Sequence, residues 1–239
     1  MGASNIVYPG VLPSWIAILF ELGDLLLSSA FWFALSVTLA EIALALALGG
    51  GAGIAIGILL GLGRNLGGAL ERYVHYLAST PKVVFLPLFF ILFGIGSPSK
   101  VAIGAFACSF PVILGTASAM RFVKPVFIHV GASFGLSPWQ MLAKVYLPSL
   151  LESIVTGLRV ALGVAFSACL IAEIRVSTAG LGSLIMASYD RSRFAEVYAL
   201  LFVIIGFAIT GNTLLDRLSR RLDRRTVLPR KVPLSRPHS

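Results

Sequence analysis

Five long runs of apolar residues are the feature of this sequence that most limits its fold. They cover roughly 31–62, 78–96, 101–120, 151–173 and 195–216. About 20 apolar residues in a helix span the hydrocarbon core of a bilayer, where backbone polar groups must be paired within helices or closed barrels. The chain is only 12% charged, about half the fraction of a soluble domain. We therefore expect an all-α integral membrane protein with five or six transmembrane helices.

The segment 11–30 leaves two readings open. It is apolar but contains Glu21 and Asp24, which lie on one face of a helix. Two carboxylates in the middle of a bilayer are costly, whereas a helix lying in the membrane interface accommodates them. We favour the interfacial helix over a sixth span. The domains are then an N-terminal periplasmic or interfacial segment (1–30), a transmembrane domain (31–216) and a basic tail (217–239).

The distribution of positive charge predicts an orientation. Eight of the nineteen lysine and arginine residues lie between 217 and 239, and the first 63 residues have none. With the C-terminus in the cytoplasm, the inside holds fifteen of these residues, including Lys82, and the outside holds four, including Lys100. Cytoplasmic loops are enriched in Lys and Arg, so we predict a cytoplasmic C-terminus. The tail is explained by contact with anionic lipid, and we expect no nucleic-acid partner.

A glycine recurs every four residues in the first apolar run. Residues at this spacing share one face of a helix, and glycines there let a second backbone approach closely. We predict that this face packs against another transmembrane helix. The glycines are Gly49, Gly53, Gly57 and Gly61.

The connection 121–150 is unusually long for a membrane protein and has helix-forming patterns of its own. We expect a first helix over about 125–134 that ends at Gly135, which suits a left-handed cap. Ser137 caps a second helix, which ends at Leu147-Pro148 because proline prevents its continuation. An ordered loop of this length favours docking of a soluble partner. Its apolar contacts would be Phe134, Leu136, Trp139 and Leu142.

Gly135, Leu147-Pro148 twelve residues later and then Gly157-Leu158-Arg159 resemble the EAA loop of binding-protein-dependent ABC importer permeases. Further motifs resemble the nitrate, sulfonate and taurine branch of that family, and the resemblance covers about 11–222. It implies the type I ABC importer (MetI-like) permease fold with a cytoplasmic coupling helix. These motifs are Leu12-Pro13-Ser14, Pro81-Lys82, Leu86-Pro87-Leu88, Phe93-Gly94-Ile95-Gly96, Phe110-Pro111, Ala172-Glu173 and Gly180-Leu181-Gly182.

The resemblance also implies partners and a location. In this family the loop sits in a groove of a cytoplasmic ATPase, and 125–148 takes that role here with Gly135 as the hinge. Two ATPase subunits would hold ATP and Mg²⁺, while this chain binds no cofactor. An extracytoplasmic solute-binding protein and a second permease copy or homologue complete the assembly in the bacterial inner membrane. The implied coupling residues are His129, Gly131, Ala132, Phe134, Gly135, Leu136, Ser137, Trp139, Leu147 and Pro148.

Three positions depart from the family pattern. His129-Val130-Gly131 stands where the family has Glu-Ala-Ala, so His129 either makes a replacement polar contact with the ATPase or faces solvent. Glu41 stands where the family usually has arginine, and it needs a basic partner from another helix. Only eleven residues precede Leu12-Pro13-Ser14 in the sequence, too few for the span that usually comes before this motif, so we expect either a five-span variant or a start site that lies further upstream.

The motifs of catalysis and metal binding are missing from the sequence. It has no HExxH, no metal-spaced His or Cys set, no GxSxG and no ATP-binding P-loop, so we expect no enzyme and no metal site. Polar residues inside the spans are candidates for a solute path, although Ser and Thr there mostly bond neighbouring groups. An acid such as Glu173 needs a partner, and Arg175 is the nearest one. The path candidates are Ser109, Thr116, Ser118, Ser167 and Glu173.

The resemblance implies a permease that imports a small solute such as a sulfonate, taurine or nitrate by ATP-driven alternating access. Relatives of this branch carry aromatic acids or pyrimidine vitamin precursors, and these compounds are alternative solutes for this chain. The absence of an obvious basic residue deep in a span argues against a fixed anion site. A secondary transporter and a structural subunit are the alternatives, and an internal repeat would favour the former. Gly180-Leu181-Gly182 is either a turn or a contact for the binding protein.

Overall fold

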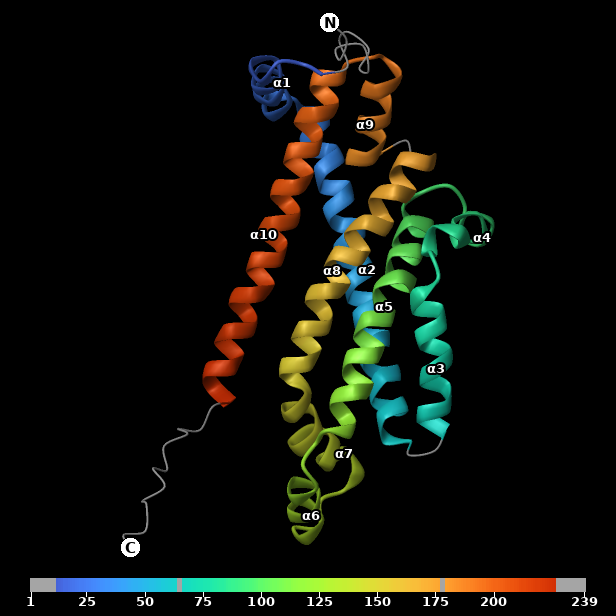
Figure 1. The fold of residues 1–239 in the computed structure, drawn as a ribbon, viewed down its shortest axis with the longest axis vertical. Helices are drawn as coiled ribbons and strands as arrows, with labels where there is room; N and C mark the ends of the chain where they lie inside the picture. The colour runs from blue at the N-terminus through green and yellow to red at the C-terminus, as the bar shows by residue number, and fades with distance from the viewer. Residues whose placement is uncertain (1–11, 64–65, 177–178, 227–239) are drawn as a thin grey trace, which may run out of the picture.

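The computed structural model describes residues 12–63, 66–176 and 179–226, which form an all-helical bundle elongated along one axis (Figure 1). Four described helices are long and apolar enough to cross a membrane, or five if one bent pair counts as a span. The predicted all-α membrane fold is confirmed. The elements are α1 (Trp15–Leu27), α2 (Ser29–Leu62), α3 (Leu66–Ser79), η1 (Lys82–Phe85), α4 (Leu86–Phe93), α5 (Ser97–Arg121), α6 (Pro125–Ser133), α7 (Pro138–Met141), η2 (Leu142–Tyr146), α8 (Leu147–Val176), α9 (Leu181–Asp190) and α10 (Phe194–Thr226).

Helix α1 is separate from the spans. The Ser14 hydroxyl caps it by accepting a hydrogen bond from the Ala17 amide at 3.2 Å, and Trp15 packs on Phe202 of α10. Its 13 residues extend roughly 20 Å, which is less than the 30 Å or so of hydrocarbon. In Figure 1 it is seen nearly end-on while α2 and α10 run along the long axis. This placement supports the interfacial reading over a sixth span.

Helices α2 and α5 pack along the predicted glycine face. A Cβ on Gly53 would lie 2.8 Å from the Val112 Cβ, and one on Gly57 would lie 2.6 Å from the Thr116 Cβ. Gly49 and Gly61 likewise face α5. Side chains cannot fit at such distances, so only glycine allows this helix separation. The prediction of a glycine packing face is confirmed.

The second span is bent, and the prediction of one run over 78–96 was wrong. Helix α3 ends at Ser79, η1 begins at Lys82, and the two arms of the pair meet at 87°. The break falls beside Pro81, while Pro87 sits in the first turn of α4, where its missing N–H leaves no helical bond unmade. Lys82 therefore lies at the break inside the bent pair, rather than at the cytoplasmic end of a span.

Helix α8 begins further upstream than the sequence predicted. We expected a stop at Leu147-Pro148, but one continuous helical rod runs from Pro138 to Arg175. The turn before the proline, Leu142–Tyr146, is a π-helix. Its wider hydrogen-bond pattern accommodates an imino residue that would break a regular α-helix.

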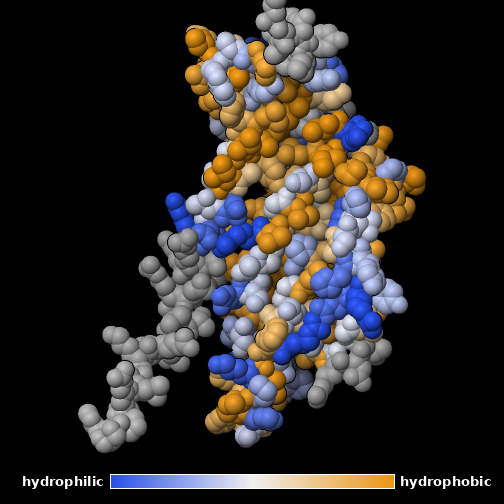
Figure 2. Space-filling view, viewed as in Figure 1, coloured by the Kyte–Doolittle hydropathy of each residue, from blue (hydrophilic) through white to orange (hydrophobic). Residues whose placement is uncertain are grey.

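The surface of the bundle is rich in exposed apolar side chains. Figure 2 shows hydrophobic residues over much of one face, with hydrophilic residues gathered toward the end that holds α6 and α7. Leu59, Ile91 and Phe33 are 69%, 82% and 64% exposed, as expected for side chains that contact lipid. Helix α10 continues to Thr226. The rest of the predicted tail and residues 1–11 lie outside the described residues.

Candidate functional site

A wide groove of about 1240 Å³ opens where α5, α6 and α8 meet. Its walls are mainly apolar, and its charged lining residues are Lys124, Lys144 and Glu152. We call it the α6 groove. The predicted coupling residues that line it are Gly131, Phe134, Leu136 and Pro148.

A second groove of about 500 Å³ lies between α5, α8 and the break of the bent span. We call it the Lys82 groove. Val160 of α8 lines both grooves, so they meet on one face. From Ser149 to Ile171 the α8 residues of this face cover roughly 33 Å at 1.5 Å per residue. The hollowed face therefore has about the depth of a bilayer core.

The structure separates the five predicted path residues. Ser118 lines the α6 groove, and Ser167 lines the Lys82 groove. Ser109 donates to its own helix at the Phe106 carbonyl. Thr116 is fully buried against α2, and Glu173 is fully buried near α9. These last three line neither the α6 groove nor the Lys82 groove.

The predicted helical hairpin is present at the end of the α6 groove. Gly135 adopts a left-handed conformation, with φ +65°, and the amide of Leu136 donates to the Gly131 carbonyl at 3.2 Å. Ser137 then forms a capping box: its hydroxyl accepts from the Gln140 amide, and the Gln140 side chain accepts from the Ser137 amide. Both ends of the short turn are thereby fixed.

The hairpin exposes large aromatic side chains. Phe134 and Trp139 are 79% and 78% exposed, and His129 is also exposed. Gly131 is buried where a Cβ would meet the Met141 side chain at 2.8 Å, so close packing of α6 on α7 fixes the hairpin. Exposed, rigidly held aromatics are typical of docking surfaces. The predicted coupling role of these residues stays a prediction.

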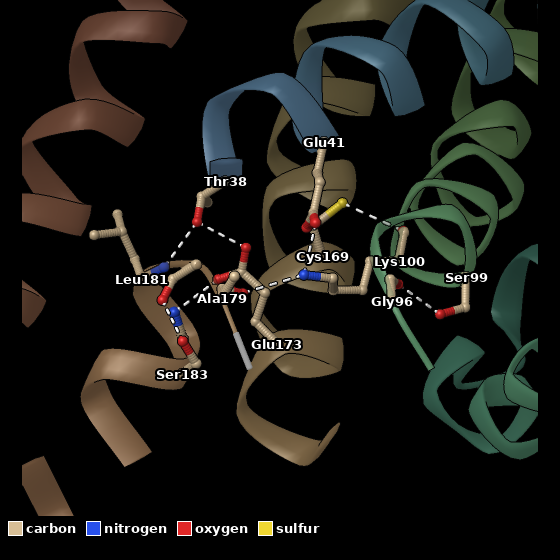
Figure 3. Close-up of polar contacts among 12 residues, drawn as sticks. Thr38, Glu41, Gly96, Ser99, Lys100, Cys169, Glu173, Ala179, Leu181 and Ser183 are labelled. Carbon is tan, nitrogen blue, oxygen red and sulfur yellow. Dashed lines mark hydrogen bonds and ion pairs between the residues drawn. The ribbon is translucent and has the colours of Figure 1, made fainter. Parts of the chain in front are cut away.

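A buried ion pair joins α2 to α5 near the opposite end of the bundle. Lys100 Nζ lies 2.6 Å from Glu41 Oε1, and the two side chains are 2% and 3% exposed. Lys100 also donates to the Ala179 carbonyl at 3.2 Å, which ties the segment before α9 to α5 (Figure 3). Glu41 thus has the basic partner that the sequence required but did not identify.

Glu173 anchors the start of α9 in the same region (Figure 3). Its carboxylate accepts from the Thr38 hydroxyl at 2.7 Å and from the Gly182 amide at 2.7 Å. The Thr38 hydroxyl in turn accepts from the Leu181 amide at 2.8 Å. Gly180 has φ +112°, and a Cβ there would strike the carboxylate. The Gly-Leu-Gly motif is therefore shaped around Glu173.

The expectation that Arg175 pairs with Glu173 was wrong. Arg175 is exposed, whereas the carboxylate points inward to Thr38 and Gly182. Residues two apart on a helix do not face each other, and this spacing could have excluded the pair. Sequence reasoning also missed Lys100 as a fully buried residue and Lys82 as a half-buried residue of a groove, because it counted the first on the external side of the membrane and the second on the cytoplasmic side.

Replacing Thr38 with valine is expected to lower the free energy of unfolding by about 2 kcal/mol, because a buried acceptor and a buried amide lose their shared partner. Amide exchange at Leu181 should accelerate. Thr210→Val is the control, since that hydroxyl bonds only its own helix at an exposed position. Thermal unfolding in detergent and hydrogen exchange would measure both effects. Equal behaviour of the two variants would contradict the anchoring role.

Comparisons with known proteins agree with this architecture. Residues 53–228 match the family described as "Binding-protein-dependent transport system inner membrane component". The chain is 31% identical over 225 residues to a putative aliphatic sulfonates transport permease protein, SsuC, of Bacillus subtilis, covering 94% of this chain and 80% of that protein. It is 34% identical over 196 residues to the taurine transport system permease protein TauC of Escherichia coli, covering 82% and 71%.

The fold is similar to that of an inward-facing MetNI methionine ABC transporter, with a TM-score of 0.69 and 19% identity over 88% of this chain and 99% of that one. The bundle of spans agrees with the family match. Together they define the class of protein as an ABC importer permease, which is a non-catalytic membrane subunit. The chain belongs to the family of binding-protein-dependent transport system inner membrane components. The resemblance drawn from the motifs is confirmed.

Proposed function

We propose that this permease carries a small organic anion of the sulfonate or taurine class into the cytoplasm by ATP-driven alternating access. The observation that carries the proposal is the hollowed face of α5 and α8, which has the depth of a bilayer and ends at the exposed hairpin. The solute class is supported by the sulfonate and taurine permeases to which the chain is similar.

The face lies open on one chain, so a second copy or a homologous permease would close it into a path. The proposed path contains Ser118 and Ser167, which line the two grooves. An external binding protein would deliver the solute at the α9 end. The ATP and Mg²⁺ that drive the cycle would be held by two ATPase subunits at the hairpin.

The proposed orientation has the hairpin and the C-terminus in the cytoplasm. Arg121, Lys124 and Lys144 lie at the hairpin end, whereas Arg191 and Arg193 lie beyond α9. Lys100 is buried and Lys82 lines a groove at the break of the bent helix pair, so we leave both out of the count. The remaining excess of positive charge still favours the hairpin end as cytoplasmic.

Truncating both exposed aromatics of the hairpin, Phe134→Ala with Trp139→Ala, should weaken binding of the cognate ATPase at least tenfold, since interface aromatics carry much of the binding energy. The measurement is a quantitative pull-down of the detergent-solubilised permease. Phe33→Ala is the control because this phenylalanine is also largely exposed, at 64%, but lies on a span. His129→Ala tests whether the histidine makes a polar contact.

Retention of the ATPase by the double variant would overturn the coupling role of the hairpin.

The solute is tested by uptake of labelled taurine and methanesulfonate into proteoliposomes with all subunits present. Uptake of an aromatic acid or a pyrimidine, without uptake of the sulfonates, would replace the proposed solute class with one of these. Uptake that follows an ion gradient without ATPase would identify a secondary transporter.

A further inference from the structure

We propose that Lys82 forms an anion-binding site in the outer half of the solute path, which takes a small monoanion with a short apolar part, such as an alkyl sulfonate. The proposal rests on the proposed function and deepens it. It reverses the expectation from sequence that the spans hold no basic residue able to contact an anion.

The position of Lys82 follows from the break in the second span. The two arms meet at 87°, and this bend brings η1 against α5 and α8, where Lys82 lines the groove. Its ammonium group lies 5.2 Å from the centre of the Phe110 ring and donates to the Ala78 carbonyl at the end of α3. The backbone break therefore places a half-buried cation in the lining of the Lys82 groove.

The charge in this groove is uncompensated within the described part of the chain. Lys82 is the charged member of the groove lining. The two buried acids of the described residues are engaged elsewhere: Glu41 pairs with Lys100, and Glu173 accepts from Thr38 and Gly182. An ammonium group has three donors, and one carbonyl uses one of them. Two remain for a ligand.

The groove around the ammonium group selects for a particular kind of anion. Its other walls include Ile103, Ala107, Val160 and Val164. Ser167 also lines it, and its hydroxyl donates to the Gly163 carbonyl at 3.0 Å. Beside mainly apolar walls a cation attracts a negative charge more strongly than it does in bulk water, while the same walls favour an alkyl group. A compact anion without a carbon chain would use the charge but leave the walls unfilled.

Lys82 also caps the C-terminus of α3, where a cation at the last carbonyls is favourable. This structural role would exist without any ligand, so the test must remove charge and keep the cap. Lys82→Gln does this, because a glutamine amide can still donate to the Ala78 carbonyl. Lys82→Arg keeps the charge and is the conservative variant.

The experiment measures local potential by thiol labelling, which needs no knowledge of the solute. In the full chain, Ser167→Cys is labelled with 2-sulfonatoethyl methanethiosulfonate, itself a small alkyl sulfonate, and with the trimethylammonium analogue. The native thiols of Cys108 and Cys169 are fully buried. We expect Lys82→Gln to lower the ratio of anionic to cationic labelling rates about tenfold, and Lys82→Arg to leave it unchanged.

The control places the thiol in the α6 groove, at Thr156, where Lys82→Gln should not alter the ratio. An unchanged ratio at Ser167→Cys, no labelling there, or an equal change at Thr156→Cys would overturn the anion site. Uptake in proteoliposomes separates the two proposals. If the ratio changes as expected but the wild-type complex imports no sulfonate, the anion site stands and the proposed function fails.

Discussion

Lys100→Met is expected to destabilise the protein by about 3–5 kcal/mol, the cost of leaving a buried charge without its partner. Glu41 would remain 3% exposed, with its carboxylate left without the cation that now pairs with it. The loss should appear as a large drop in thermal stability in detergent. It should also appear as faster reaction of Cys108 and Cys169 with a thiol reagent, because both thiols are buried in the native fold.

The double variant Glu41→Leu with Lys100→Met tests whether charge, rather than packing, sets this loss. Replacing a buried ion pair with apolar residues is often close to neutral, so the double variant should recover most of the lost stability. A residual deficit is expected because Lys100 also donates to the Ala179 carbonyl. A double variant as unstable as Lys100→Met alone would show that the pair contributes through shape instead.

Gly53→Leu is expected to cost about 3 kcal/mol or more, because any side chain there overlaps α5. A Cβ would already lie 2.9 Å from the Ser109 carbonyl oxygen, so α2 must move away along the whole packing face. The measurement is thermal unfolding of the purified chain, with helix content followed by circular dichroism.

Gly51→Leu is the matched control for this prediction. It lies in the same helix two residues away, and a Cβ there has nothing within 4 Å. Leucine favours a helix over glycine by nearly 1 kcal/mol, so this variant should be neutral or slightly stabilising. Similar losses at both positions would mean that glycine matters through backbone flexibility, and would contradict the packing role.

Much of the fold could be predicted from the sequence because lipid imposes simple patterns. The apolar runs locate four spans, three of them to within a few residues, while the helix of the fourth begins at Pro138 rather than near 151. The glycine period identifies a packing face, and Gly135 with Ser137 identifies a hairpin. These features depend on local spacing and on backbone chemistry that few residues can satisfy. The family motifs then added partners that spacing alone does not imply.

The missed features depend on contacts between distant segments. The second span was misplaced because its first arm, α3, carries Glu71, Arg72 and His75 and does not read as apolar. The partner of Glu173 is Thr38, 135 residues away, and no local pattern reports it. The helix was predicted to stop at Pro148, but a π-helical turn before the proline lets the helix continue. Such a turn has no sequence signature.

Under the proposed coupling role, the uninterrupted helix from Pro138 to Arg175 would act as a lever. If it pivots where the two grooves meet at Val160, its arm to Trp139 is roughly 31 Å and its arm to Glu173 is roughly 20 Å, at 1.5 Å per residue. A push on the hairpin would then move the α9 anchor about two-thirds as far in the opposite direction. The π-turn of η2 lies within the longer arm, so its stiffness sets how much of the stroke crosses the membrane.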